Sequence, residues 1–174
     1  MSLSEKNKTT PSSEFQENLE ILRQTYFFSG LPLETLKIFA YLCTREKFRP
    51  GENIFRQDED DGQAFYIIEG TAKLERRNNG EASEVRDCKA GEFLGGLTLM
   101  GDTGRLFSLK AVTETTCLVL SREKFSKTME QFPGLMMKIC KAVAQQIETW
   151  EKRFLADQGD QCGECMRRLG VTLI

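Results

Sequence analysis

The feature that most constrains the fold is a series of six short strand-like segments between residues 53 and 120, each bounded by Gly, Asp, Asn or Lys. These segments are Asn53–Phe55, Ala64–Ile68, Ala72–Arg76, Glu84–Arg86, Phe107–Ala111 and Cys117–Leu120. Asn78-Asn79-Gly80 favours a tight hairpin, because Asn-Gly tolerates positive φ at both central positions. Many short strands with regularly spaced turns predict a β-sandwich or a small barrel.

Helical spacing of apolar residues flanks the strand region on both sides. Before it, one helix is predicted from about Ser13 to Tyr26, and a second short helix follows Gly30-Leu31-Pro32. After it, a helix is predicted from Ser121, and a long amphipathic helix covers residues 134–156. The apolar stripe of the long helix consists of Met136, Ile139, Val143, Ile147, Trp150 and Phe154.

The domain organisation follows from these patterns. Residues 1–13 are polar and predict a disordered N-terminus. Residues 14–156 form the predicted domain, and residues 157–174 form a polar tail that contains two cysteines. With 174 residues, a single domain with terminal appendages is expected.

Composition excludes several function classes. The chain contains no histidine, which excludes Ser-His-Asp and Cys-His nucleophile systems and histidine-ligated metals. A net charge of −2 gives no bulk attraction to nucleic acid or to anionic membranes. No apolar run approaches the length of a bilayer span, and the N-terminus lacks a signal-peptide core. We therefore expect a cytosolic (cytoplasmic) protein that is not an enzyme.

The stretch Gly91–Ser108, GEFLGGLTLMGDTGRLFS, combines five glycines with a single arginine, Arg105. Glycines allow backbone N–H groups to approach an anion closely, and a short helix starting near Gly96 would add the positive end of its dipole. Arg105 could then clamp a phosphate with charge-assisted hydrogen bonds. The alternative is a glycine-rich turn in which Arg105 is a surface residue paired with Asp102 or Glu92.

Several phrases in this order resemble the cyclic nucleotide-binding domain family, the sensor module of catabolite-activator-type regulators and of protein kinase A regulatory subunits. The phrases are FFSGLPLETLKIFA, FRPGENIFRQ, AFYIIEGTAKL, the 91–108 stretch and LVLSREKFSKTMEQFP, and the resemblance covers about residues 20–156. It implies an α+β fold: a jelly-roll β-barrel (double-stranded β-helix) with N-terminal helices and a long C-terminal dimerisation helix.

The resemblance also implies the site residues. Arg105 matches the arginine that clamps the cyclic phosphate, and Gly95, Gly96 and Leu97 match the backbone that lines the sugar-phosphate. Gly96 departs from the family, which usually has at this position a glutamate that accepts the ribose 2′-hydroxyl. The segment ends with Leu106, Phe107 and Ser108, the first two of which replace small residues, so Phe107 either narrows the pocket or joins the core.

Two functions remain open at this stage. In the first, the domain is a sensor that binds cAMP, cGMP or a related phosphate-containing molecule through an altered cassette. In the second, the pocket is degenerate and the chain is a dimeric scaffold that responds to redox state or metal.

In catabolite-activator relatives the final helix forms a parallel coiled-coil dimer and covers the pocket. The apolar stripe of residues 134–156 suits a homodimer, and the alternative is that it packs on its own chain. The register of the resemblance puts Trp150 near the purine, where it could stack on the base or fill its space. The tail after Phe154 is too short for a helix-turn-helix, so DNA binding by this chain alone is not expected.

Cys162-Gly-Glu-Cys165 forms a CxxC pair in the tail. One such pair cannot complete a tetrahedral metal site, but two pairs in a parallel dimer could together form a four-cysteine site for zinc or an iron–sulfur cluster. The alternative is a mobile tail with two incidental thiols. The four other cysteines sit singly among apolar residues and are expected to fill the core.

Overall fold

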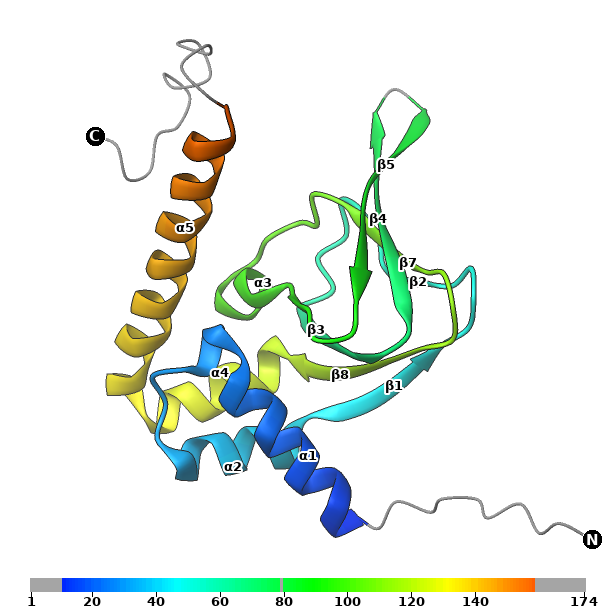
Figure 1. Cartoon of the computed structure of the whole chain (residues 1–174). Coiled ribbons are helices and arrows are strands. Elements are labelled where there is room, and N and C mark those ends of the chain that lie inside the picture. Colours follow the sequence, from blue (N-terminus) through cyan, green and yellow to red (C-terminus); the bar gives the residue numbers. More distant parts are fainter. Residues whose placement is uncertain (1–10, 79, 159–174) are drawn as a thin grey trace, which may run out of the picture.

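The computed structural model of the chain describes residues 11–78 and 80–158. Its elements, in chain order, are α1 (Pro11–Gln24), η1 (Tyr26–Phe28), α2 (Leu33–Leu42), β1 (Thr44–Phe48), β2 (Asn53–Phe55), β3 (Gln63–Glu69), β4 (Thr71–Asn78), β5 (Glu81–Lys89), β6 (Phe93–Leu94), α3 (Gly96–Met100), β7 (Ser108–Ala111), β8 (Thr115–Ser121), α4 (Arg122–Gln131), η2 (Pro133–Leu135) and α5 (Met136–Gln158). Helices thus precede and follow the β region, which α3 interrupts between β6 and β7 (Figure 1).

The strands form two four-stranded antiparallel sheets with the orders β1-β8-β3-β6 and β2-β7-β4-β5. The predicted hairpin is confirmed, because Asn78 at the end of β4 lies opposite Glu81 at the start of β5. The prediction of a barrel needs correction: the described strands form two separate sheets, and no hydrogen-bonded ladder joins one sheet to the other. The antiparallel β-sandwich with flanking helices is confirmed.

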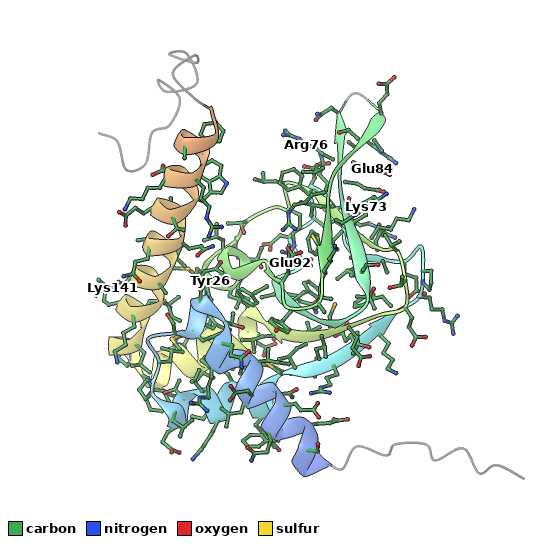
Figure 2. All side chains as sticks on the ribbon, viewed as in Figure 1. Tyr26, Lys73, Arg76, Glu84, Glu92 and Lys141 are labelled. Carbon is green, nitrogen blue, oxygen red and sulfur yellow. The ribbon has the colours of Figure 1, made fainter. Side chains whose placement is uncertain are left out.

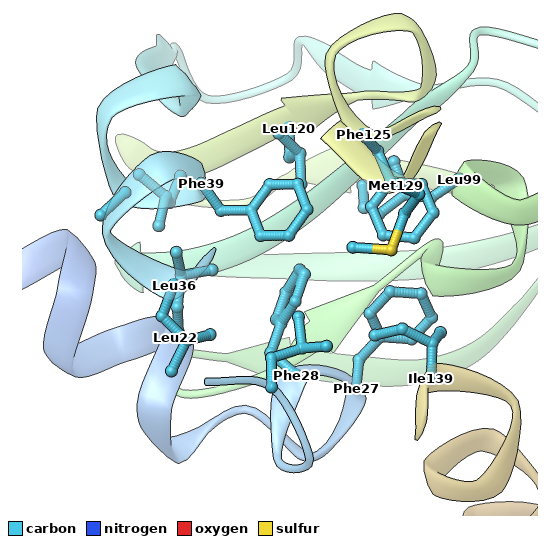
Figure 3. Packing of buried hydrophobic residues seen from close by; sticks show 14 of the residues in the cluster. Leu22, Phe27, Phe28, Leu36, Phe39, Leu99, Leu120, Phe125, Met129 and Ile139 are labelled. Atoms are coloured by element: carbon cyan, nitrogen blue, oxygen red, sulfur yellow. The ribbon is translucent and has the colours of Figure 1, made fainter. Parts of the chain in front are cut away.

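Apolar side chains form two clusters, one on each face of the sheet that contains β3 and β8. Cys117 and Val119 of β8 point into the cluster between the two sheets, whereas Leu118 and Leu120 point toward the helices. Because both faces of β8 are covered, its sequence is continuously apolar rather than alternating. The helical cluster is rich in phenylalanine and includes Phe27, Phe28, Phe39 and Phe125 (Figure 3).

The cysteines of the described region are free. Cys88 and Cys117 are buried between the sheets, as predicted, and burial raises the pKa of the Cys117 thiol to about 12. Cys43 and Cys140 are only partly buried.

Some predicted boundaries were wrong. Helix α1 begins at Pro11, so residues 11–13 are helical rather than part of a disordered terminus. Strand β1 was missed because its sequence, TREKF, is mostly charged and lies at a sheet edge. Strand β6 was missed because it is only two residues long.

The apolar stripe of α5 divides into two parts. Ile139 is 1% exposed in the helical cluster, and Met136 and Val143 pack against that cluster. Trp150 is 56% exposed and stacks on Phe154, with ring centroids 5.5 Å apart. The first half of the stripe therefore packs on its own chain, whereas Trp150 in the second half is exposed. None of the helices in the described ranges is long and apolar enough to cross a membrane.

Candidate functional site

The glycine-rich stretch forms β6 and the short helix α3, which begins at Gly96 as predicted. Gly95 precedes the helix with φ 81°, in the left-handed region that favours glycine. A Cβ at Gly95 would collide with Nη1 of Arg105 and would lie 2.9 Å from the carbonyl oxygen of Gln63. Position 95 therefore requires a glycine, because of its backbone conformation and because Arg105 lies where a Cβ would be.

Gly96 is enclosed by aromatic rings. A Cβ at this position would lie 2.9 Å from ring atoms of both Phe27 and Phe93. The two rings pack against each other with centroids 5.6 Å apart. The space that a larger residue 96 would need is therefore occupied by the aromatic core.

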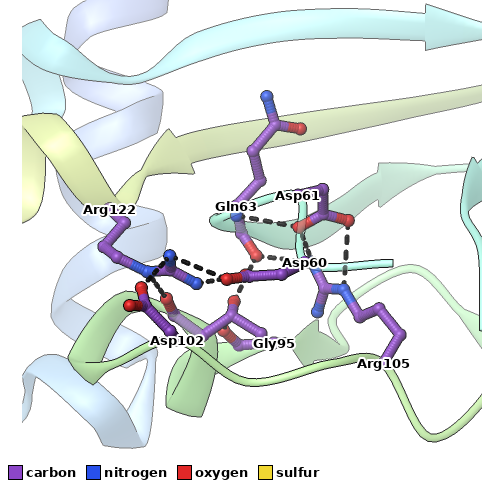
Figure 4. Close-up of polar contacts among 8 residues, drawn as sticks. Asp60, Asp61, Gln63, Gly95, Asp102, Arg105 and Arg122 are labelled. Carbon is purple, nitrogen blue, oxygen red and sulfur yellow. Dashed lines mark hydrogen bonds and ion pairs between the residues drawn. The ribbon is translucent and has the colours of Figure 1, made fainter. Parts of the chain in front are cut away.

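Arg105 is buried, with 6% of its surface exposed. Its Nε and Nη2 donate to the carboxylate of Asp61 at 3.1 and 2.6 Å, and Nη2 also donates to the carbonyl oxygen of Gln63 at 2.6 Å (Figure 4). The guanidinium lies over the ring of Phe55, 4.2 Å from its centroid. In the described part of the chain, Nη1 has no acceptor and lies beside Gly95. This nitrogen is free to bind an anion.

The alternative pairing of Arg105 was wrong. Asp102 pairs with Arg122 at 2.7 Å, and Glu92 pairs with Arg86 at 2.6 Å. The partner of Arg105 is instead Asp61, which belongs to the acidic loop Asp58–Asp61 between β2 and β3.

A second arginine fixes the same loop from the other side. Arg122, the first residue of α4, donates to Asp60, to Asp102 at 2.7 Å and to the carbonyl oxygen of Thr98 in α3 at 2.5 Å (Figure 4). The hydrogen bond from Arg122 holds the pKa of the Asp60 carboxyl below its usual value. The acidic loop, α3 and α4 are therefore linked through one guanidinium.

A cavity of about 590 Å³ opens beside α3 and is lined mostly by apolar side chains. Its wall contains six of the predicted residues: Gly95, Gly96, Leu97, Arg105, Leu106 and Phe107. The residues that the sequence reasoning missed are Tyr26, Phe55, Leu74, Phe93, Leu94, Thr98, Thr103 and Gly104. Burial raises the pKa of the Tyr26 phenol, which lies between the cavity and α5 (Figure 2).

Two predicted ligand residues do not line this cavity. Ser108 is on the other face of its strand, where its hydroxyl oxygen accepts the backbone N–H of Gln57 at 2.9 Å. The sequence could have indicated that Ser108 points away from Phe107 and Leu109, because neighbouring residues of a strand point to opposite faces. Trp150 is on the exposed part of α5 and stacks on Phe154 instead.

The predicted metal ligands Cys162 and Cys165 lie outside the described residues. Within residues 11–78 and 80–158, no three or more Cys, Asp or Glu side chains are grouped in a way that could hold a metal ion.

A family model described as the cyclic nucleotide-binding domain matches residues 45–132, which include Arg105, Arg122 and all of α3. The cAMP-dependent protein kinase regulatory subunit of Emericella nidulans is 33% identical over 107 residues, which cover 62% of this chain and 25% of that protein. The chain thus spans about a quarter of the length of this curated relative.

Solved structures show the same fold. A cyclic nucleotide-binding-like protein from Brucella abortus has a TM-score of 0.61 and 27% identity, covering 66% of this chain and 98% of that chain. The regulatory domain of Toxoplasma gondii PKA, solved with cAMP, has a TM-score of 0.61 and 21% identity, covering 75% of this chain and 51% of that chain. The family match and the fold agree, and the chain belongs to the cyclic nucleotide-binding domain family.

Proposed function

We propose that this chain is a regulatory sensor domain whose cavity binds a cyclic nucleotide, with the cyclic phosphate held by Arg105 and the backbone of Gly95–Leu97. The observation that carries the proposal is Nη1 of Arg105, which lies beside Gly95 without an acceptor in the described chain. Asp61 and Gln63 orient the guanidinium from behind, so a bound phosphate would complete its set of hydrogen bonds.

The ribose would be held differently from the family pattern. Gly96 offers no side-chain acceptor, and the described residues that line the cavity include no carboxylate. A ribose 2′-hydroxyl would therefore lack a charged partner, and the cavity would accept cyclic phosphates that have no such group. The rings of Phe55, Phe93 and Phe107 offer an apolar surface for a planar base.

A signal from the cavity would reach α5 through the aromatic core. Tyr26 of η1 lines the cavity, and its neighbour Phe27 belongs to the same cluster as Ile139 of α5 (Figure 3). The exposed half of α5, with Trp150 at 56% exposure, would form a homodimer with the same helix of a second copy. Sedimentation of a Trp150→Glu variant tests this part, since a monomer–dimer shift is expected only if this half of α5 forms the interface.

The test of the proposal is calorimetric titration with cAMP and cGMP. Replacing Arg105 alone would leave the partly buried Asp61 without its ion-pair partner, so the informative variant is the double substitution Arg105→Gln with Asp61→Asn, which removes both charges. Lys47→Gln, at an exposed position of β1, is the matched loss of a cation elsewhere.

We expect the native chain and Lys47→Gln to bind with the same affinity, and the double variant to lose about tenfold or more in affinity. Unfolding curves would verify that the double variant is folded. No heat of binding with either nucleotide, or undiminished binding by a folded double variant, would overturn the proposal.

A further inference from the structure

A second concave site lies on the outer face of the sheet β2-β7-β4-β5, away from the cavity. Because Leu74 and Leu109 point into the cluster between the sheets, their strand neighbours Glu75, Ser108 and Lys110 point outward. Together with Arg56 and Arg77, these outward residues line a pocket of about 310 Å³.

The floor of this outer pocket is fixed by Gln57. The backbone N–H of Arg77 donates to Oε1 of Gln57 at 2.8 Å, and Nε2 of Gln57 donates to the carbonyl oxygen of Arg77 at 3.1 Å. The backbone N–H of Gln57 donates to the hydroxyl oxygen of Ser108 at 2.9 Å. Gln57 thus closes the pocket between β7 and the end of β4, and it leaves the hydroxyl hydrogen of Ser108 free to donate.

The cations of the outer pocket lack close anionic partners. Within the described chain, neither Arg77 nor Lys110 has a carboxylate within ion-pair distance, and the nearest one to Arg56 is Glu59 at 3.9 Å. Lys73 on the same sheet is different, because it pairs with Glu84 at 2.7 Å (Figure 2). The one carboxylate among the described lining residues is Glu75, so the lining carries three cations and one anion, and Glu59 lies outside it.

We propose that the outer pocket binds a phosphomonoester dianion. Among the lining residues alone, three cations against Glu75 leave two positive charges in excess, and Glu59, 3.9 Å from Arg56, offsets part of one of them. A phosphomonoester suits this excess, because its charge approaches about −2 at neutral pH. Two guanidinium groups, an ammonium and a hydroxyl supply more hydrogen-bond donors than a phosphate group has terminal oxygens. The cyclic phosphate of the first site carries only one charge, so the two sites would select different ligands.

The phosphomonoester could belong to a small metabolite or to a phosphorylated side chain. The experiment therefore uses two probes, glycerol 3-phosphate and a short phosphoserine peptide, in separate NMR and calorimetric titrations of the full chain. Sulfate and unphosphorylated peptide are the controls for adventitious anion binding. Cyclic AMP is added in a separate arm to keep the cavity site distinct.

We expect at least one probe to shift the amide signals of Arg77 and Ser108, and Lys110→Gln to weaken that binding about tenfold. Glu75→Gln should strengthen it by several fold, because this substitution removes the one opposing charge. Lys47→Gln and the Arg105→Gln, Asp61→Asn double variant should leave it unchanged.

Equal binding of sulfate and the phosphomonoester, or equal affinity of the native chain and Lys110→Gln, would overturn the inference. Failure of cAMP to bind while a phosphomonoester still binds would separate the two sites, and would contradict only the proposed function of the cavity.

Discussion

The inner and outer faces of the sheet β2-β7-β4-β5 are built from the same strands but differ in polarity and in charge. The inner face carries Phe55, Leu74 and Leu109 and borders a largely apolar cavity with one buried cation, Arg105. The outer face carries Lys110 and Arg77 without carboxylate partners in the described chain. Strand alternation therefore separates two kinds of site. On the inner face, burial strengthens the interaction of one guanidinium with an anion, whereas on the outer face binding depends on the summed charge of exposed side chains.

The largest test of this comparison concerns two neighbouring residues of β7. Leu109 is 0% exposed, so Leu109→Ala should reduce the free energy of unfolding by about 2–5 kcal/mol. Lys110→Ala on the opposite face should change it by no more than about 0.5 kcal/mol. Urea unfolding of both variants measures the difference. Equal effects would mean that the two faces are not divided as described.

The second test concerns the aromatic wall of the cavity. Gly96→Ala would place a Cβ 2.9 Å from Phe27 and Phe93, and it should destabilise the protein by about 1–3 kcal/mol. Gly101→Ala is the matched control, because a Cβ there meets no atom within 4 Å. Thermal unfolding compares the two variants. A neutral Gly96→Ala would show that the rings can move and that the position could accept a larger side chain.

The third test uses pH at the acidic loop between β2 and β3. Arg122 lowers the pKa of the Asp60 carboxyl from its usual 3.8, so the ionised form is favoured by folding. The stability from this pair is fully present above pH 3.8 and is lost as the pH falls through the lower native value. Asp60→Asn should therefore flatten the acid part of a plot of urea midpoint against pH. An unchanged acid slope would rule out this ion pair as its source.

The smallest expected effect sharpens the account of the cavity. A charged acceptor for the ribose 2′-hydroxyl would contribute ~1.5–3 kcal/mol, or about one to two decades in affinity. Since no carboxylate is among the described lining residues, 2′-deoxy-cAMP should bind within about threefold of cAMP. Competition titration measures the ratio. A loss of tenfold or more for the deoxy ligand would point to an acceptor elsewhere in the protein.

The sequence alone predicted most of the elements in their order, apart from the strands β1 and β6. Turn residues at regular spacing predicted the β region, Asn-Gly predicted the β4–β5 hairpin, and the glycine-rich stretch predicted the start of α3. The phosphate-clamping role of Arg105 stays a prediction. These features are local, because a turn or a helix start depends on a few neighbouring residues. The charged edge strand β1 could not be predicted in this way, because its pairing with β8 depends on a distant part of the chain.

Only the tertiary structure decided which residues meet. Asp61 pairs with Arg105 from 44 positions away, a contact that no local pattern around Asp61 predicts. Phe27 and Phe93 lie where a side chain at position 96 would begin, so a larger residue there would require these rings to shift. The apolar stripe of α5 looks uniform in the sequence. Long-range packing buries Ile139 and leaves Trp150 exposed, because the sandwich and its helices cover only the first part of α5.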